Sequence, residues 1–166
     1  MPVHPFSILI CKLITMNVKY ILFCFHLIVL SACSKVTNCV NQIAGTWTIS
    51  NITLTDTSGN EYDLLNTDST TTTGFIEFTK YNTASPNQLG TLRQTLTVFD
   101  YGSQTLSQSS TELDYRLDEE CTKILAFDST SVDAYEYAVI IELSNSLATL
   151  QNADPSFGTV TTILTR

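Results

Sequence analysis

Histidine is nearly absent from this chain of 166 residues. The only two, His4 and His26, precede Cys33 and fall in a stretch that has the features of a leader, as shown below. Without an imidazole, the rest of the chain cannot form a Ser–His or Cys–His nucleophile pair and cannot hold a metal ion through histidine. These classes of site are therefore excluded from the part of the chain after the leader.

Positive charge is scarce in the same part. From Cys33 onward the chain has six Lys and Arg against sixteen Asp and Glu over 134 residues, which is a formal charge of −10. A surface of this sign repels phosphate backbones. We therefore expect no nucleic-acid partner.

The apolar run Ile21–Leu30 is too short for a good membrane span. At ~1.5 Å per residue, its ten residues reach about half of a ~30 Å hydrocarbon core. The run has the length of the apolar region of a signal peptide, and Lys19 supplies the positive charge that precedes such a region. Met16 is an alternative start, because Met16-Asn17-Val18-Lys19 would open a compact leader.

Leu30-Ser31-Ala32-Cys33 follows this run directly. An aliphatic residue, two small residues and a cysteine resemble the bacterial lipobox, in which the cysteine is lipidated and becomes the mature N-terminus. The resemblance implies a signal peptide over residues 1–32, lipidation of Cys33 and attachment to a membrane. The alternative is an uncleaved anchor in which Cys33 is an ordinary cysteine.

The residues after Cys33 predict to which membrane the lipidated protein is attached. An Asp at the next position is the usual inner-membrane retention signal in enteric-type sorting, and this chain has Ser34 there. Ser34–Asn38 also contains no acidic residue of the kind that precedes surface export in some lineages. We therefore expect a lipid-anchored protein of the cell envelope, on the outer membrane and facing the periplasm.

Helical periodicity is absent after Ile43, and residues 45–166 have the pattern of β-strands. The phase of the first strand shifts, because Trp47 and Ile49 are odd whereas Ile52 and Leu54 are even. One extra residue around Ser50-Asn51 would cause this shift, so we predict a β-bulge there. Residues 33–44 are expected to form a lipidated tether that ends in one helical turn around Val40 to Ala44.

Further strands are predicted between turn-forming residues. They are Tyr62–Leu65, Phe75–Thr79, Thr91–Phe99, Gln104–Ser109, Glu112–Leu117, Lys123–Phe127, Tyr135–Leu143, Leu147–Gln151 and Thr159–Leu164. The clearest alternation puts Tyr135, Tyr137, Val139, Ile141 and Leu143 on one face and Glu136 and Glu142 on the other. Thr67–Thr73 is expected to be a flexible polar loop.

Many short strands with frequent turns predict an all-β domain. We expect an antiparallel up-and-down β-barrel of about 8–10 strands, since closure removes the exposed edges of a sheet. A β-sandwich is the alternative.

Gly45-Thr46-Trp47 opens the first predicted strand. The motif resembles the Gly-x-Trp signature of lipocalins and of the small lipocalin-like domains of bacterial lipoproteins, in which a lipobox, a short spacer and a meander of strands occur in this order. The resemblance implies that Gly45 lets the chain turn tightly into the strand and that Trp47 plugs the closed end of the barrel. It also makes Arg166 the candidate for the basic residue that packs over this Trp. The alternative is a core tryptophan of any β-sandwich.

Carboxylates are the remaining candidates for catalysis, because glycoside hydrolysis needs two acids ~5–10 Å apart. The densest cluster, Asp118-Glu119-Glu120, has the pattern of a solvated hairpin turn and lacks the spacing of a calcium loop. We therefore expect no enzymatic activity, no metal site and no cofactor.

Cys39 and Cys121 are the only thiols after Cys33. In an oxidising envelope they can form a disulfide, and a closed span of this length would stabilise the fold by roughly 4–5 kcal/mol in the loop-entropy model. Two free thiols are the alternative.

Two functions are consistent with these features. The first is a membrane-anchored lipocalin-like module that binds a small apolar or amphiphilic ligand. The second is a structural or interaction lipoprotein that binds a protein partner in an envelope assembly and has no small-molecule ligand. An open apolar cavity behind Trp47 would favour the first, and an interior filled by side chains would favour the second. The sequence does not identify the ligand-binding residues.

Overall fold

A helix at residues 35–43 precedes nine β-strands in the computed structural model, which describes residues 35–85, 87–127 and 133–166. The strands are β1 (Gly45–Thr55), β2 (Glu61–Asp63), β3 (Thr70–Phe78), β4 (Gly90–Asp100), β5 (Thr105–Leu117), β6 (Lys123–Phe127), β7 (Ala134–Leu143), β8 (Leu147–Asp154) and β9 (Gly158–Thr165). The predicted signal peptide, lipobox and Cys33 lie outside the described residues. Among those residues, no helix combines the length and hydropathy needed to cross a membrane.

Eight of the strands close an antiparallel up-and-down barrel. Each strand from β3 to β8 pairs with the next along the chain, and β1 pairs with both β3 and β9. β2 pairs only with the end of β1, through Thr53–Thr55, and so extends the sheet outside the barrel. The predicted barrel is therefore confirmed, and its strand number falls within the predicted range.

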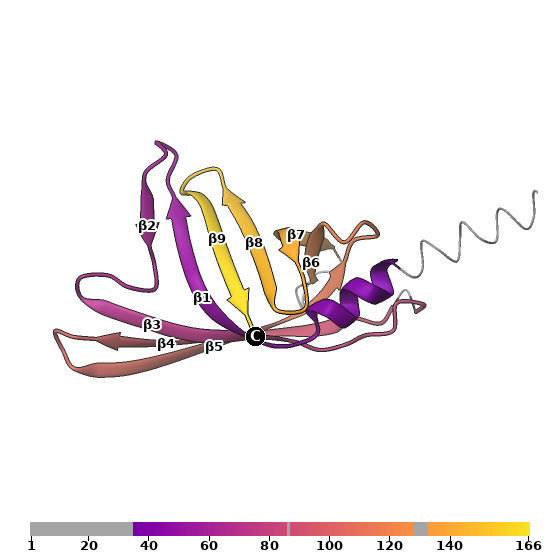
Figure 1. Cartoon of the computed structure of the whole chain (residues 1–166), viewed down its shortest axis with the longest axis horizontal. Coiled ribbons are helices and arrows are strands. Elements are labelled where there is room, and N and C mark those ends of the chain that lie inside the picture. Colours follow the sequence, from indigo (N-terminus) through magenta and orange to yellow (C-terminus); the bar gives the residue numbers. More distant parts are fainter. Residues whose placement is uncertain (1–34, 86, 128–132) are drawn as a thin grey trace, which may run out of the picture. The chain divides into compact units, whose positions relative to one another are not determined.

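β1 connects two differently directed parts of the barrel. Figure 1 shows β3, β4 and β5 running side by side, whereas β1, β9 and β8 cross them at a steep angle. Gly45–Thr48 pairs with β3, and the chain from Thr48 to Thr55 pairs with β9. The β1–β9 register shifts between Ile49 and Asn51, which confirms the predicted bulge and bends the strand where it changes partner.

β7 contains two further irregularities. The register with β6 passes from Ile124↔Ala138 to Leu125↔Glu136, so Tyr137 is an extra residue on β7. The register with β8 shifts in the same way between Ile140 and Glu142. Because each bulge changes the phase of the alternation, Ala138 and Ile140 are buried while Ile141 is 55% exposed. The predicted apolar face of β7 was therefore wrong, although Glu136 and Glu142 are exposed as expected.

Three other expectations differ from the structure. The residues expected to form two strands, Gln104–Ser109 and Glu112–Leu117, belong to one continuous strand, β5, except for Gln104, which lies in the turn before it. Ser110 and Thr111 do not interrupt the strand, because both pair with β4 in an unbroken register. Thr70–Thr73 forms the first part of β3 and pairs with β4, so only residues 67–69 of the expected loop lie outside a strand. The helix at residues 35–43 is longer than the single turn expected near Val40. Its apolar face packs into the core through Val40 and Ile43, and this tertiary contact stabilises a helix whose polar sequence gave no signal.

Candidate functional site

One end of the barrel is closed by the helix, Trp47 and Arg166. Trp47 is fully buried, and its indole N–H donates a hydrogen bond to the carbonyl of Ile43 at 2.6 Å. The guanidinium of Arg166 lies over the indole ring, with its Cζ 3.8 Å from the ring centroid. The same guanidinium donates to the carbonyls of Ile43 and Ala44 at 3.1 and 2.6 Å, where the C-terminal end of the helix favours a cation.

Gly45 allows this arrangement to form. Its φ is +116°, in the region that favours glycine, and a Cβ at this position would meet Nη2 of Arg166 at 3.3 Å. The residue therefore permits both the turn into β1 and the close approach of the guanidinium.

Cys39 and Cys121 form a disulfide. It joins the helix to the turn between β5 and β6, and the two Cα atoms are 6.3 Å apart. In that turn the Asp118 carboxylate accepts hydrogen bonds from the backbone N–H groups of Thr122 and Lys123 at 2.7 and 2.9 Å. Asp118-Glu119-Glu120 thus forms a hairpin turn, as predicted, and Asp118 serves to stabilise it.

Two buried tyrosines pack near the same end of the barrel. Tyr115 donates a hydrogen bond to the carbonyl of Thr79 at 2.9 Å, and the hydroxyl of Tyr81 accepts one from the N–H of Leu117 at 2.8 Å. The rings meet edge to face, 5.6 Å apart. Burial raises the pKa of both hydroxyls, so both tyrosines are neutral at physiological pH.

A cavity of about 280 Å³ lies between residues of six barrel strands, and it is partly open to solvent. Its apolar lining consists of Ile52, Ile76, Ala138, Leu150 and Val160. Its polar lining consists of Gln94, Tyr137, Gln151, Asn152 and Thr162. Among the residues that the structure describes, no charged side chain lines the cavity, although the domain as a whole is strongly acidic.

The bulge in β7 brings Tyr137 to the cavity. Tyr137 and its neighbour Ala138 both line the space, and at a bulge two successive side chains can lie on the same face of a sheet. The Tyr137 hydroxyl donates to Oε1 of Gln94 at 3.2 Å, and Nδ2 of Asn152 donates to the Tyr137 carbonyl at 2.6 Å. Burial raises the pKa of Tyr137, so its hydroxyl remains protonated and able to donate.

Sequence reasoning did not identify these lining residues. It placed Tyr137 on the apolar face of a regular strand and did not consider Gln94 or Asn152. One signal was present, because Tyr137–Ile141 contains five apolar residues in succession where a half-buried strand should alternate. Such a run is consistent with a local loss of the period-two phase, which is what a bulge produces.

A shallow groove beside β2 is the other hollow of interest. It is lined by Leu54, Glu61, Tyr62, Asp63, Leu64, Thr67 and Asp68, and most of it faces open solvent. Within the described parts of the chain, no group of three or more His, Cys, Asp and Glu residues is arranged to hold a metal ion. The cavity between the barrel strands is more enclosed than this groove and is thus the better candidate for a ligand site.

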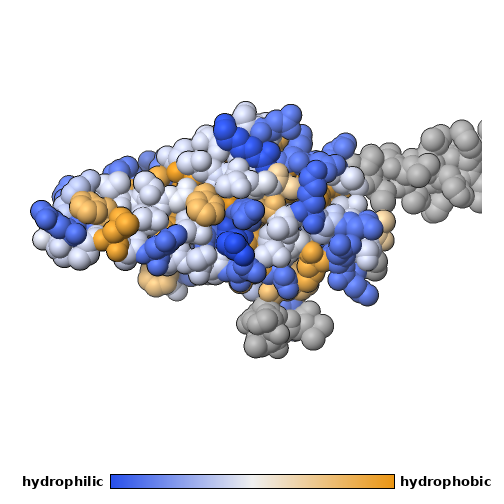
Figure 2. Space-filling view, turned by 90° about the horizontal axis from the view of Figure 1, so that it is seen from below, coloured by the Kyte–Doolittle hydropathy of each residue, from blue (hydrophilic) through white to orange (hydrophobic). Residues whose placement is uncertain are grey.

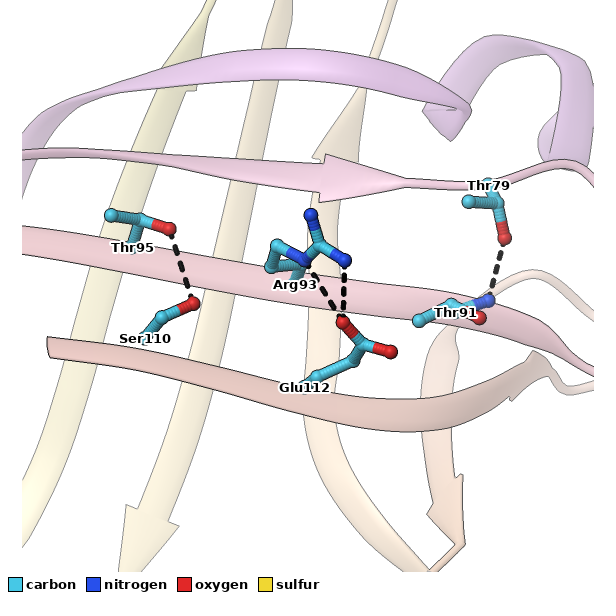
Figure 3. Close-up of polar contacts among 6 residues, drawn as sticks. All are labelled: Thr79, Thr91, Arg93, Thr95, Ser110 and Glu112. Atoms are coloured by element: carbon cyan, nitrogen blue, oxygen red, sulfur yellow. Dashed lines mark hydrogen bonds and ion pairs between the residues drawn. The ribbon is translucent and has the colours of Figure 1, made fainter.

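The outer face of β4 and β5 is polar and internally paired. Arg93 donates through Nε and Nη2 to one oxygen of Glu112 at 2.9 and 2.7 Å, and Thr95 and Ser110 are 3.3 Å apart (Figure 3). On the side of the domain seen in Figure 2, hydrophilic residues dominate and hydrophobic ones are scattered among them.

No protein-family model matches the chain, and no curated protein matches it in sequence. Function is therefore inferred from the geometry of the domain and from its sequence motifs.

Proposed function

We propose that this chain is a membrane-anchored bacterial lipoprotein whose lipocalin-like barrel binds a small, uncharged amphiphilic molecule. The cavity carries the proposal, because it lies between six strands and is lined by apolar side chains with a few polar groups. The Gly45-Thr46-Trp47 opening, the plugged end and the single meander of strands support the lipocalin-like assignment.

The lining defines the class of ligand. An ion brought into a cavity without a charged partner would lose its hydration uncompensated, so a neutral molecule is favoured. Gln94, Tyr137 and Asn152 offer amide and hydroxyl groups to the polar part of a ligand, while Ile52 and Leu150 contact its apolar part. At about 280 Å³ the cavity is slightly smaller than the ~300–1,000 Å³ typical of sites for drug-sized ligands, so the ligand should be compact.

The proposed anchor and site place the ligand at the envelope. Lipid on Cys33 would hold the barrel at the outer membrane, on the periplasmic side, where amphiphilic molecules partition. The function is binding, storage or transfer of such a molecule, with no chemical step, because the cavity contains neither a charged group nor a nucleophile–base pair.

Native mass spectrometry of the full-length protein purified from its own host tests the binding site. We expect a stoichiometric mass excess that disappears when Ala138 is replaced by Phe, because the larger side chain fills the cavity. Ala134→Phe is the matched control, since Ala134 lies on the same strand but is exposed. A wild-type protein without bound mass, or an Ala138→Phe variant that retains it, would contradict the proposed site.

A further inference from the structure

Most of β5 has one edge that no described strand covers. β5 pairs with β4 over eleven successive residue pairs, from Gly90↔Tyr115 to Asp100↔Thr105, but its pairing with β6 covers only Asp114–Leu117. Within the part of the chain that the structure describes, no strand pairs with the other side of Thr105–Leu113. Every residue from Thr105 to Glu112 is exposed.

This edge lacks the features that normally prevent edge-to-edge pairing. Natural edge strands are short, bulged or carry Pro or charged residues, Lys above all. Thr105–Thr111 contains no Pro and no charged residue, although the domain has a formal charge of −10, and its register with β4 has no bulge. Leu106 lies on this edge with 70% of its surface exposed. In Figure 2, hydrophobic residues are visible at the left-hand end, the end at which the β4–β5 hairpin turns in Figure 1.

The segment is also complementary to itself. Ser, Thr and Gln side chains both donate and accept hydrogen bonds, so identical residues can satisfy one another across a two-fold axis. An antiparallel pair centred on Ser109 would put Gln108 opposite Ser110 and Ser107 opposite Thr111. Glu112, the nearest acid, would then face Leu106 of the other copy, so no like charges would meet.

We propose that the free edge of β5 is a homodimer interface, at which two copies of this chain pair antiparallel through Thr105–Glu112 and form one continuous sheet. The main-chain groups of the edge supply the hydrogen bonds, and burial of Leu106 adds apolar contact. The interface is narrow, so pairing should be weak in dilute solution and promoted where the chains are concentrated on one membrane. Neither the edge nor its pairing depends on the cavity.

Cysteine cross-linking of the full-length protein in host membranes tests this interface. Across a directly opposed pair the Cβ atoms are ~4.5–5.5 Å apart, which is within reach of a disulfide. Ser109→Cys should therefore yield at least about tenfold more disulfide-linked homodimer than Thr97→Cys. Thr97 is the matched control because it lies on the neighbouring strand β4, which is paired on both sides. Because the Thr97→Cys protein keeps the native cysteines, it also measures the cross-links that these cysteines make by themselves.

A second variant tests whether edge pairing causes the cross-link. Gln108→Lys adds a charge to each copy near the two-fold axis, so the Ser109→Cys/Gln108→Lys double variant should lose most of the homodimer. Equal cross-linking of Ser109→Cys and Thr97→Cys, no cross-linking at either position, or a cross-link from Ser109→Cys to a different protein would overturn the proposal. Ligand binding by the cavity would be unaffected by any of these results.

Discussion

Arg166 and Trp47 hold the closed end of the barrel together at the scale of single residues. The guanidinium combines a cation–π contact with charge-assisted hydrogen bonds to two carbonyls at the end of the helix. Because these contacts join Arg166 to the helix and to β1, they connect residues that are more than 100 positions apart in the sequence. The arrangement fits the resemblance of Gly45-Thr46-Trp47 to lipocalins.

Replacing Arg166 by Gln should lower the free energy of unfolding by about 1–3 kcal/mol, the sum of a modest cation–π term and the charged hydrogen bonds. Trp47 is the only tryptophan, so its fluorescence during urea denaturation measures the effect directly. Arg166→Lys keeps the charge but loses the planar donor geometry, and it should fall between the wild type and Arg166→Gln. Identical denaturation midpoints for all three proteins would contradict this role.

Tyr115 should make the fold sensitive to alkaline pH. Burial raises the pKa of its hydroxyl above the ordinary value of 10.0, so above about pH 10 the folded state binds more protons than the unfolded state. The contribution of Tyr115 to the free energy of unfolding is therefore complete below pH 10 and is lost as the pH rises further. Urea denaturation at several pH values between 9 and 11.5 should show a shallower decline for Tyr115→Phe than for the wild type. The matched control is Tyr101→Phe, which removes a tyrosine hydroxyl at the exposed end of the hairpin.

At the scale of elements, the disulfide determines how firmly the helix is attached. Cys39 lies in the helix and Cys121 in the turn after β5, 82 residues later in the chain. The disulfide therefore holds the helix at the closed end of the barrel independently of Arg166. Val40 and Ile43 hold the same helix through their contacts in the core.

Breaking this disulfide should lower the free energy of unfolding by up to about 4–5 kcal/mol in the loop-entropy model. Chemical denaturation of Cys39→Ser, Cys121→Ser and the double variant measures the loss. All three should be destabilised by a similar amount, because either single change already removes the bond. Additive effects of the two substitutions would show that the thiols act separately.

Two of the strands that line the cavity, β1 and β7, contain bulges. β1 changes partner at its bulge, and β7 uses Tyr137 as an extra residue that lines the interior. A regular eight-stranded barrel leaves an interior just wide enough for side chains or for one small ligand. The small side chain of Ala138 helps to keep the interior open near Tyr137.

At the scale of the whole molecule, the leader and the lipobox predict that the protein is attached to a membrane. We expect Cys33 to carry lipid, so growth of the host with an alkyne-bearing fatty acid should label the wild-type protein. Cys33→Ala should abolish the label, while Cys39→Ser should retain it. Labelling of Cys33→Ala would disprove lipidation at Cys33 and remove the basis for the proposed outer-membrane location.

Much of the architecture follows from local patterns in the sequence. Alternation in β4, β6 and β9 predicted these strands, and the phase shift between Ile49 and Ile52 predicted the bulge in β1. Two of the failures share a cause: Thr70–Thr73 of β3 and Ser110-Thr111 of β5 lie in Ser- and Thr-rich segments, which contain no apolar alternation. The strands form there because each backbone finds a hydrogen-bonding partner in β4, which is not a property of the segment itself.

The sequence by itself determined the acidic, histidine-free character of the domain, its β structure and the pairing options of its two cysteines, because composition and period-two alternation are local properties. Only the tertiary structure decided that the sheet closes, that Tyr137 and Ala138 both line the cavity, and that Thr105–Glu112 keeps a free edge. These features depend on the register between strands, and register is set by long-range pairing and by bulges that shift the phase by one residue.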